Sequence, residues 1–212
     1  MCSNSGRWMW LAAAILLPMM TAQAVVVTPG NTVAISGTSV GLRPELGGPI
    51  IVDDTVAYSI PGFASGTIQR RVVRDIGGTL DFYWQVTRDA NSTVDIGSLR
   101  VRGFESVTTD VDFRTDGLGT LGPSSVHSFS PNLGYLNFNF NPALSPATTS
   151  RFMFIHTDAT TYHLESDALD VATPEQNPIS NSLPTYVPGV PEPATMSLLA
   201  LGGLAVLRRK RK

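Results

Sequence analysis

Two short glycine motifs have the residue spacing of sites that do chemistry. Residues 37–41, with Ser39 at their centre, match the nucleophile elbow G-x-S-x-G, in which a strand-to-helix turn exposes a catalytic serine. The segment that follows contains Pro44 and ends in two glycines, so it does not predict that helix. Residues 117–122 match G-x-G-x-x-G, but Pro123 follows and no helix is predicted whose N-terminus could bind a pyrophosphate. We therefore expect neither a catalytic serine nor a dinucleotide site.

Aspartates close together in the sequence are candidate calcium ligands, because this cation prefers several carboxylate oxygens. These residues are Asp110, Asp112 and Asp116. An EF-hand loop would need an oxygen ligand at the position of Arg114, and a solvated strand face explains the alternation of Asp110 and Asp112 equally well. We therefore predict no calcium site here.

Histidines are the other candidate metal ligands, and the chain has three of them: His127, His156 and His163. A zinc site needs three or four convergent ligands, often with short spacing. His156 and His163 are seven residues apart and fall on different predicted strand faces. The sequence thus predicts no metal, no cofactor and no catalytic residue.

The elements that must position any site are strands. Apolar and polar residues alternate over 80–87, 99–102, 110–114 and 136–141, a two-residue period that buries one face of a strand. In the first of these runs the predicted solvent face comprises Asp81, Tyr83, Gln85 and Thr87. Further strand-like runs are 25–27, 33–35, 50–56, 68–73 and 152–155. Short strands separated by turn residues predict an all-β fold, a single β-sandwich or jelly-roll-like domain.

The charge of this region argues against one class of partner. Residues 25–190 contain nine arginines, no lysine and sixteen acidic residues, a formal net charge of −7. Nucleic acid requires a basic surface, so we predict no nucleic-acid partner. The acidity is typical of a soluble extracellular surface.

The N-terminal 24 residues have the three parts of a secretory signal peptide. Arg7 precedes an apolar run over residues 8–20, which is too short to span a bilayer comfortably. Ala22 and Ala24 then supply the small-x-small end, so we expect signal peptidase to cut before Val25. Cys2 would leave with this peptide, and residues 25–212 have no thiol for a disulfide or metal site.

The C-terminal 22 residues combine three features in order. Pro191, Glu192 and Pro193 precede an apolar stretch over residues 194–207. As a helix this stretch would be about 21 Å long, against a hydrocarbon core of about 30 Å. The chain ends in a basic tail of Arg208, Arg209, Lys210, Arg211 and Lys212, which should stay on the cytoplasmic side of the membrane. A core helix is the alternative, but the stretch lacks a polar face.

These C-terminal features resemble the PEP-CTERM sorting signal. The resemblance implies that the tail holds the exported chain transiently in the inner membrane by a transmembrane helix. An exosortase, a membrane-embedded cysteine transpeptidase, would then cut near the Pro-Glu-Pro motif and release the protein to the cell surface or to an extracellular, biofilm-type matrix. This logic parallels other removable apolar tail signals.

The expected domain organisation follows from these parts. We predict a signal peptide over residues 1–24, a β-sandwich domain over 25–173, a Pro/Asn/Ser-rich stalk over 174–190 and the sorting signal over 191–212.

Three classes of function remain for the β domain. The first is a non-catalytic structural or interaction role at the surface or in the matrix. The second is a carbohydrate-binding or adhesive module that contacts exopolysaccharide through wet-face residues: Tyr83, Tyr135, Asn137, Asn139 and Asn141. The third is a glycosidase with two carboxylates, for which the sequence nominates no pair. The sequence favours the first class and predicts that the protein is not an enzyme.

Overall fold

The computed structural model describes residues 25–129 and 134–189 as two antiparallel β-sheets. The five-stranded sheet has the order β2-β3-β4-β9-β6. Its strands are β2 (Ile50–Ile60), β3 (Ala64–Arg74), β4 (Leu80–Arg88), β9 (Met153–His156) and β6 (Asp110–Phe113). A short 3-10 helix, η1 (Pro44–Gly47), precedes β2.

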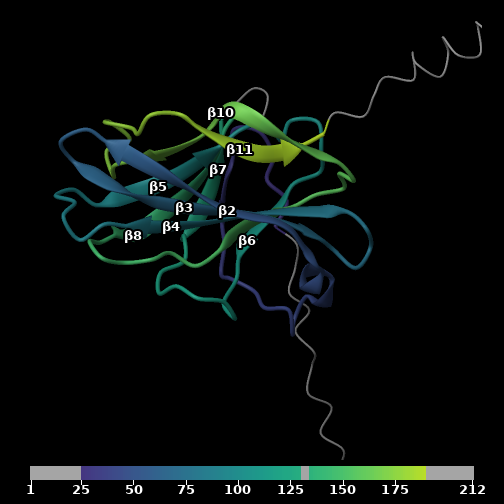
Figure 1. Cartoon of the computed structure of the whole chain (residues 1–212). Coiled ribbons are helices and arrows are strands. Elements are labelled where there is room, and N and C mark those ends of the chain that lie inside the picture. The colour runs from purple at the N-terminus through teal and green to yellow at the C-terminus, as the bar shows by residue number, and fades with distance from the viewer. Residues whose placement is uncertain (1–24, 130–133, 190–212) are drawn as a thin grey trace, which may run out of the picture.

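The six-stranded sheet has the order β1-β7-β8-β5-β10-β11. Its strands are β1 (Thr32–Ala34), β7 (Ser125–Ser128), β8 (Leu136–Leu144), β5 (Ile96–Val101), β10 (Tyr162–Ala172) and β11 (Leu183–Pro188). Figure 1 shows β10 and β11 side by side, as their antiparallel pairing requires.

A single large core joins the two sheets into a β-sandwich, which confirms the predicted fold class. Trp84 of β4 and Phe138 of β8 come from different sheets, are 1% and 0% exposed, and have ring centroids 6.4 Å apart. Phe104, from the segment after β5, packs edge-on against Trp84 and Phe82. The alternation of apolar residues along β4 explains this arrangement, because side chains two apart point to the same face.

Most of the predicted solvent face of β4 is buried, which contradicts the expected one-sided pattern, and Thr87 is half-buried. Asp81, Tyr83 and Gln85 are 0%, 3% and 6% exposed. Two loops cover this outer face of the five-stranded sheet. Leu46 of η1 belongs to a second apolar cluster with Tyr83, and Gln85 Nε2 donates to the carbonyl oxygen of Leu118 at 2.9 Å. The sandwich therefore has an additional packed layer outside one of its sheets.

The predicted stalk is wrong for its second half. Residues 183–188 form β11, the edge strand of the six-stranded sheet, paired with β10 through positions such as Tyr186 opposite Leu164. Leu183 and Val187 are 4% and 2% exposed and belong to the main core. Pro184 and Pro188 suit this position, because an edge strand tolerates residues without an N–H group. The folded domain thus extends beyond residue 173.

Within residues 25–129 and 134–189, we find no helix long and apolar enough to cross a membrane. The predicted signal peptide (1–24) and the apolar stretch at 194–207 lie outside these described residues.

Candidate functional site

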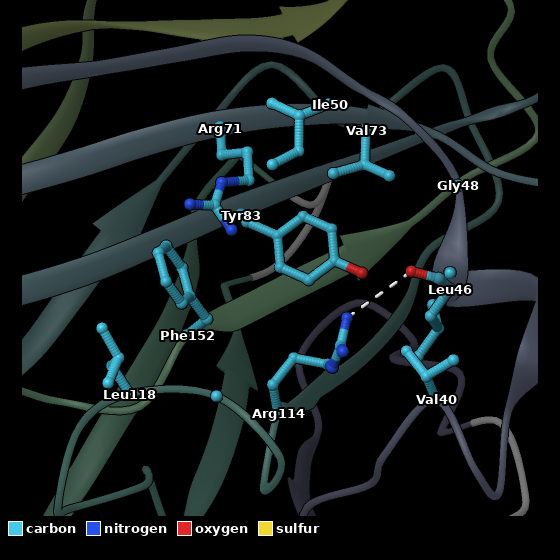
Figure 2. Close-up of a pocket in the computed structure, with 12 residues that line it drawn as sticks. Val40, Leu46, Gly48, Ile50, Arg71, Val73, Tyr83, Arg114, Leu118 and Phe152 are labelled. Carbon is cyan, nitrogen blue, oxygen red and sulfur yellow. Dashed lines mark hydrogen bonds between the residues drawn. The ribbon is translucent and has the colours of Figure 1, made fainter.

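A cavity of about 430 Å³ opens on the outer face of the five-stranded sheet, under the loops that cover it. Figure 2 shows the Tyr83 ring at its centre, with Arg71 and Phe152 on one side and Arg114 and Leu46 on the other. This volume lies in the usual range for small-molecule pockets, about 300 to 1,000 Å³.

Strands of the five-stranded sheet and the loops beside them build this outer-face cavity. Arg71 and Val73 come from β3, and Arg71 pairs in register with Tyr83 of β4. Phe152 directly precedes β9, and Arg114 directly follows β6. Side chains on one face of neighbouring strands lie close together, so β3 and β4 supply part of the floor and the ends of β9 and β6 supply the rest.

Exposed apolar side chains form part of the wall. Leu118 is 81% exposed and Ile50 is 52% exposed, whereas Tyr83 and Phe152 are 3% and 7% exposed. Large exposed apolar side chains beside a cavity mark a place where another molecule can bury surface.

The two arginines of the cavity are paired with nearby acids. Arg71 Nη2 lies 2.9 Å from Asp53 Oδ2, and the Arg71 guanidinium lies 4.5 Å from the centroid of the Phe152 ring. Arg114 donates through Nε and Nη2 to both oxygens of Asp116, at 2.6 and 3.0 Å, and these bonds hold the pKa of Asp116 below its ordinary value. The acids neutralise the charges of the two guanidinium groups, which can still donate N–H hydrogen bonds to a ligand.

Tyr83 adds a phenol hydroxyl to the floor of the cavity. Burial raises the pKa of its phenol well above the ordinary value, so the hydroxyl is neutral at physiological pH. Of the described residues that line the cavity, none is a histidine, serine, cysteine or carboxylate. The arrangement can bind a ligand, but these side chains do not form a nucleophile and base.

A buried charged cluster lies at the ends of β4 and β9. His156 Nδ1 lies 2.6 Å from Asp81 Oδ1 and 4.0 Å from Asp75 Oδ2. The hydrogen bond with Asp81 raises the pKa of His156, and burial raises the pKa of Asp81. Asp75 is held by Thr79, whose backbone N–H and hydroxyl donate to its carboxylate at 2.8 and 2.7 Å.

This cluster is the one place where described residues offer three potential metal ligands within 4.8 Å of one another. Sequence reasoning missed it, because Asp75 and Asp81 are six residues apart and His156 joins them only through the pairing of β4 with β9. The ligand atoms of Asp75 and Asp81 already accept hydrogen bonds from Thr79 and His156, respectively. We interpret the cluster as an internal network of hydrogen bonds.

The predicted calcium candidates do not converge. Asp110 contacts Arg43, Asp112 Oδ1 accepts from the Gly37 N–H at 2.8 Å, and Asp116 binds Arg114. Each carboxylate has a separate structural partner.

The three histidines also lie apart in their contacts. His127 Nδ1 shares a hydrogen bond with Thr32 at 2.8 Å, and His163 contacts Glu165 at 3.3 Å. Only His156 joins a cluster of carboxylates among the described residues.

The two glycine motifs have structural roles. Gly37 and Gly119 have positive φ angles of 82° and 108°, which favour glycine. A Cβ on Gly119 would overlap the carbonyl oxygen of Ser150, so the loop at 117–122 packs closely on the sheet. After Ser39 the chain enters turns and η1 rather than the α-helix of a nucleophile elbow.

The predicted carbohydrate-binding face is only partly exposed. Tyr83 and Asn137 are each 3% exposed, so they are wrong as wet-face residues. Asn137 is covered because its Nδ2 donates to Gln176 Oε1 at 3.0 Å. Tyr135 and Asn139 are half-buried, and Asn141 is exposed.

The predicted sorting residues from Pro191 to Lys212 and the cleavage-site residues Ala22 and Ala24 lie outside the described part of the chain. Comparison with protein families matches residues 189–212 to the PEP-CTERM protein-sorting motif. No curated protein and no solved structure matches this chain. The motif supports an exported protein that an exosortase sorts to the cell surface or the extracellular space.

Proposed function

Because the chain carries a PEP-CTERM sorting motif, we propose that its β-sandwich is a non-catalytic interaction domain that exosortase processing delivers to the cell surface or extracellular matrix. Signal peptidase would remove residues 1–24, and the tail would hold the domain at the inner membrane until it is cut. The outer-face cavity is the observation that supports an interaction role for the domain. Its wall combines exposed apolar side chains with arginine N–H donors and contains no nucleophile and base.

The ligand that this combination favours is a matrix polysaccharide. Sugar rings present C–H faces that pack on apolar side chains such as Leu118, and hydroxyl oxygens that accept from guanidinium groups such as that of Arg114. An acidic domain has no electrostatic attraction to acidic glycans, so we expect a neutral glycan to bind best.

A co-sedimentation assay tests the binding role. The exported protein is mixed with polysaccharide from its own cells, and bound protein is compared for the wild type, Leu118→Asp and the matched control Leu164→Asp. Leu164 is also an exposed leucine, at 54%, but it lies on β10. We expect Leu118→Asp alone to weaken binding, by about tenfold. Equal binding by all three proteins would exclude the cavity, and release of reducing ends from the glycan would exclude a non-catalytic role.

Recovery of the protein from its own cells tests sorting. From the wild type we expect a product that begins at Val25 and ends near Pro191. When residues 208–212 are deleted, we expect the uncut chain to accumulate instead. A released product that still contains residues 194–212 would exclude exosortase cutting.

A further inference from the structure

The backbone nitrogen of Val25 is bound to a buried carboxylate. It donates to Asp110 Oδ1 at 2.7 Å, and Asp110 is 4% exposed. The carbonyl oxygen of Val25 accepts from the Val111 N–H at 3.1 Å, and Val26 forms an antiparallel bridge with Asp110. The segment that starts at Val25 therefore adds to the free edge of β6 in the five-stranded sheet.

This segment also contributes to the core. Val27 is 3% exposed and belongs to the main apolar cluster, and Val25 packs against that cluster. The position of the Val25 nitrogen is thus fixed by packing, by the backbone hydrogen bond between Val25 and Val111, and by the bridge of Val26 with Asp110.

The carboxylate at this nitrogen is short of positive charge. Among the described ion pairs Asp110 has one partner, Arg43, whose Nη2 lies 2.6 Å from Oδ2 and whose Nε binds Glu45 at 2.8 Å. His156 lies opposite Asp110 in the register of β6 and β9, but its Nδ1 binds Asp81 at 2.6 Å. One guanidinium thus serves two acids. The contact between Arg43 and Asp110 is an ion pair without hydrogen-bond alignment, and Asp110 Oδ2 has no aligned donor although it is fully buried. A buried carboxylate in this state is stabilised by a further charged donor.

The sequence places the cut that would create such a donor at the same atom. The small-x-small pattern at Ala22 and Ala24 predicts cleavage immediately before Val25. Cleavage converts the Val25 amide nitrogen, which is neutral and has one N–H, into an α-ammonium with three N–H donors and a positive charge.

We propose that signal-peptide cleavage creates a partly buried ion pair between the α-ammonium of Val25 and the Asp110 carboxylate, which holds the new N-terminus on the edge of β6. This inference rests on the export step of the proposed function. It means that cleavage during export changes the contacts of the folded domain. The uncleaved chain can offer Asp110 only a neutral amide donor, so cleavage adds a positive charge beside the acids Glu45 and Asp110, which share Arg43.

Amine labelling can test this pair directly, because residues 25–190 contain no lysine. In that region the α-amino group of Val25 is the one primary amine, and labelling of Lys210 or Lys212 is separated by peptide mass. Acylating reagents attack the neutral amine, and pairing with a buried carboxylate lowers the neutral fraction. We expect labelling of Val25 in the native exported protein to be at least about tenfold slower than in urea, since one unit of pKa corresponds to a factor of ten.

Two variants refine the test. Asp110→Asn should raise the labelling rate toward that of the unfolded chain, whereas Asp116→Asn, which alters a carboxylate bound to Arg114, should not. The comparison of native and unfolded wild type needs no variant, so a misfolded Asp110→Asn protein leaves the test intact. A protein that begins at Val25 but labels equally fast in both states would overturn the ion pair and leave export standing. A protein that begins elsewhere would overturn both the cleavage site and the pair.

Discussion

Trp84 and Thr185 connect the two sheets by a hydrogen bond in the middle of the sandwich. The indole Nε1–H of Trp84 on β4 donates to Thr185 Oγ1 on β11 at 2.8 Å, and both residues are at most 1% exposed. A buried indole N–H needs a partner, because burial without one loses its hydrogen bond to water. The C-terminal strand thereby satisfies the largest side chain of the core.

Replacement of Thr185 by valine should destabilise the domain by about 1 to 3 kcal/mol, because it leaves the Trp84 N–H buried and unpaired. Urea unfolding followed by tryptophan fluorescence measures this loss. Thr55→Val is the matched control, since Thr55 is exposed on β2 and its hydroxyl has no hydrogen bond in the described structure. Equal stability of the two variants would mean that the bond contributes nothing.

Gly119 should be intolerant of a side chain. Its φ of 108° disfavours other residues, and a Cβ would overlap the Ser150 carbonyl group. Gly119→Ala should therefore cost about 2 to 4 kcal/mol from backbone strain and overpacking together. Thermal unfolding measures the effect, with Gly134→Ala as the control because no atom lies within 4 Å of a Cβ there. If the motif had served a nucleotide rather than packing, Gly119→Ala would leave the stability of the free protein unchanged.

An additional residue at the N-terminus should weaken the domain. A chain that begins at Ala24 replaces the proposed ammonium at Asp110 by a neutral amide donor. The carboxylate acceptor is charged in both chains, so the difference is the contribution of an ion pair, and the extended chain should be less stable by up to about 1 kcal/mol. The difference is measured by urea unfolding of the two chains. It should disappear in the Asp110→Asn background, and a difference that persists there would trace to something other than the ion pair.

The strand pattern of the sequence was sufficient to predict the class of fold, but not the loops that cover the outer face of the five-stranded sheet. The alternation at residues 80–87 correctly predicts a strand, β4, with Phe82 and Trp84 in the core. It cannot reveal that loops from distant parts of the chain cover the opposite face and bury Tyr83. Alternation reports polarity along one strand, whereas coverage by another segment depends on tertiary contacts.

The candidate sites were less predictable for a related reason. The outer-face cavity combines Arg71 of β3 with Phe152, which are 81 positions apart in the chain and meet only after the sheet forms. Similarly, Val25 and Asp110 are separated by 85 positions. Local motifs carry no information about such pairs, and the two glycine motifs, around Ser39 and Gly119, lie in loops with structural roles.

The His156 cluster should make stability depend on pH. The hydrogen bond with Asp81 raises the pKa of His156 in the folded protein above its value in the unfolded chain, about 6.5. The folded state therefore binds this proton more tightly than the unfolded state. Its stabilising effect is fully present below about pH 6.5 and is lost as the pH rises through the folded pKa. The raised pKa of Asp81 acts in the same direction at lower pH.

Urea unfolding as a function of pH measures this dependence. We expect the unfolding free energy to fall between about pH 6.5 and the folded pKa of His156 in the wild type, and His156→Gln to remove that slope. His163→Gln is the control, because the His163 side chain is 45% exposed and contacts only Glu165 among the described ion pairs. A slope that survives in His156→Gln would show that another group titrates, and a slope of opposite sign would mean that His156 is neutral in the fold. In that case Asp81 would be held by the neutral imidazole, and the cluster would stabilise the sandwich without binding an additional proton.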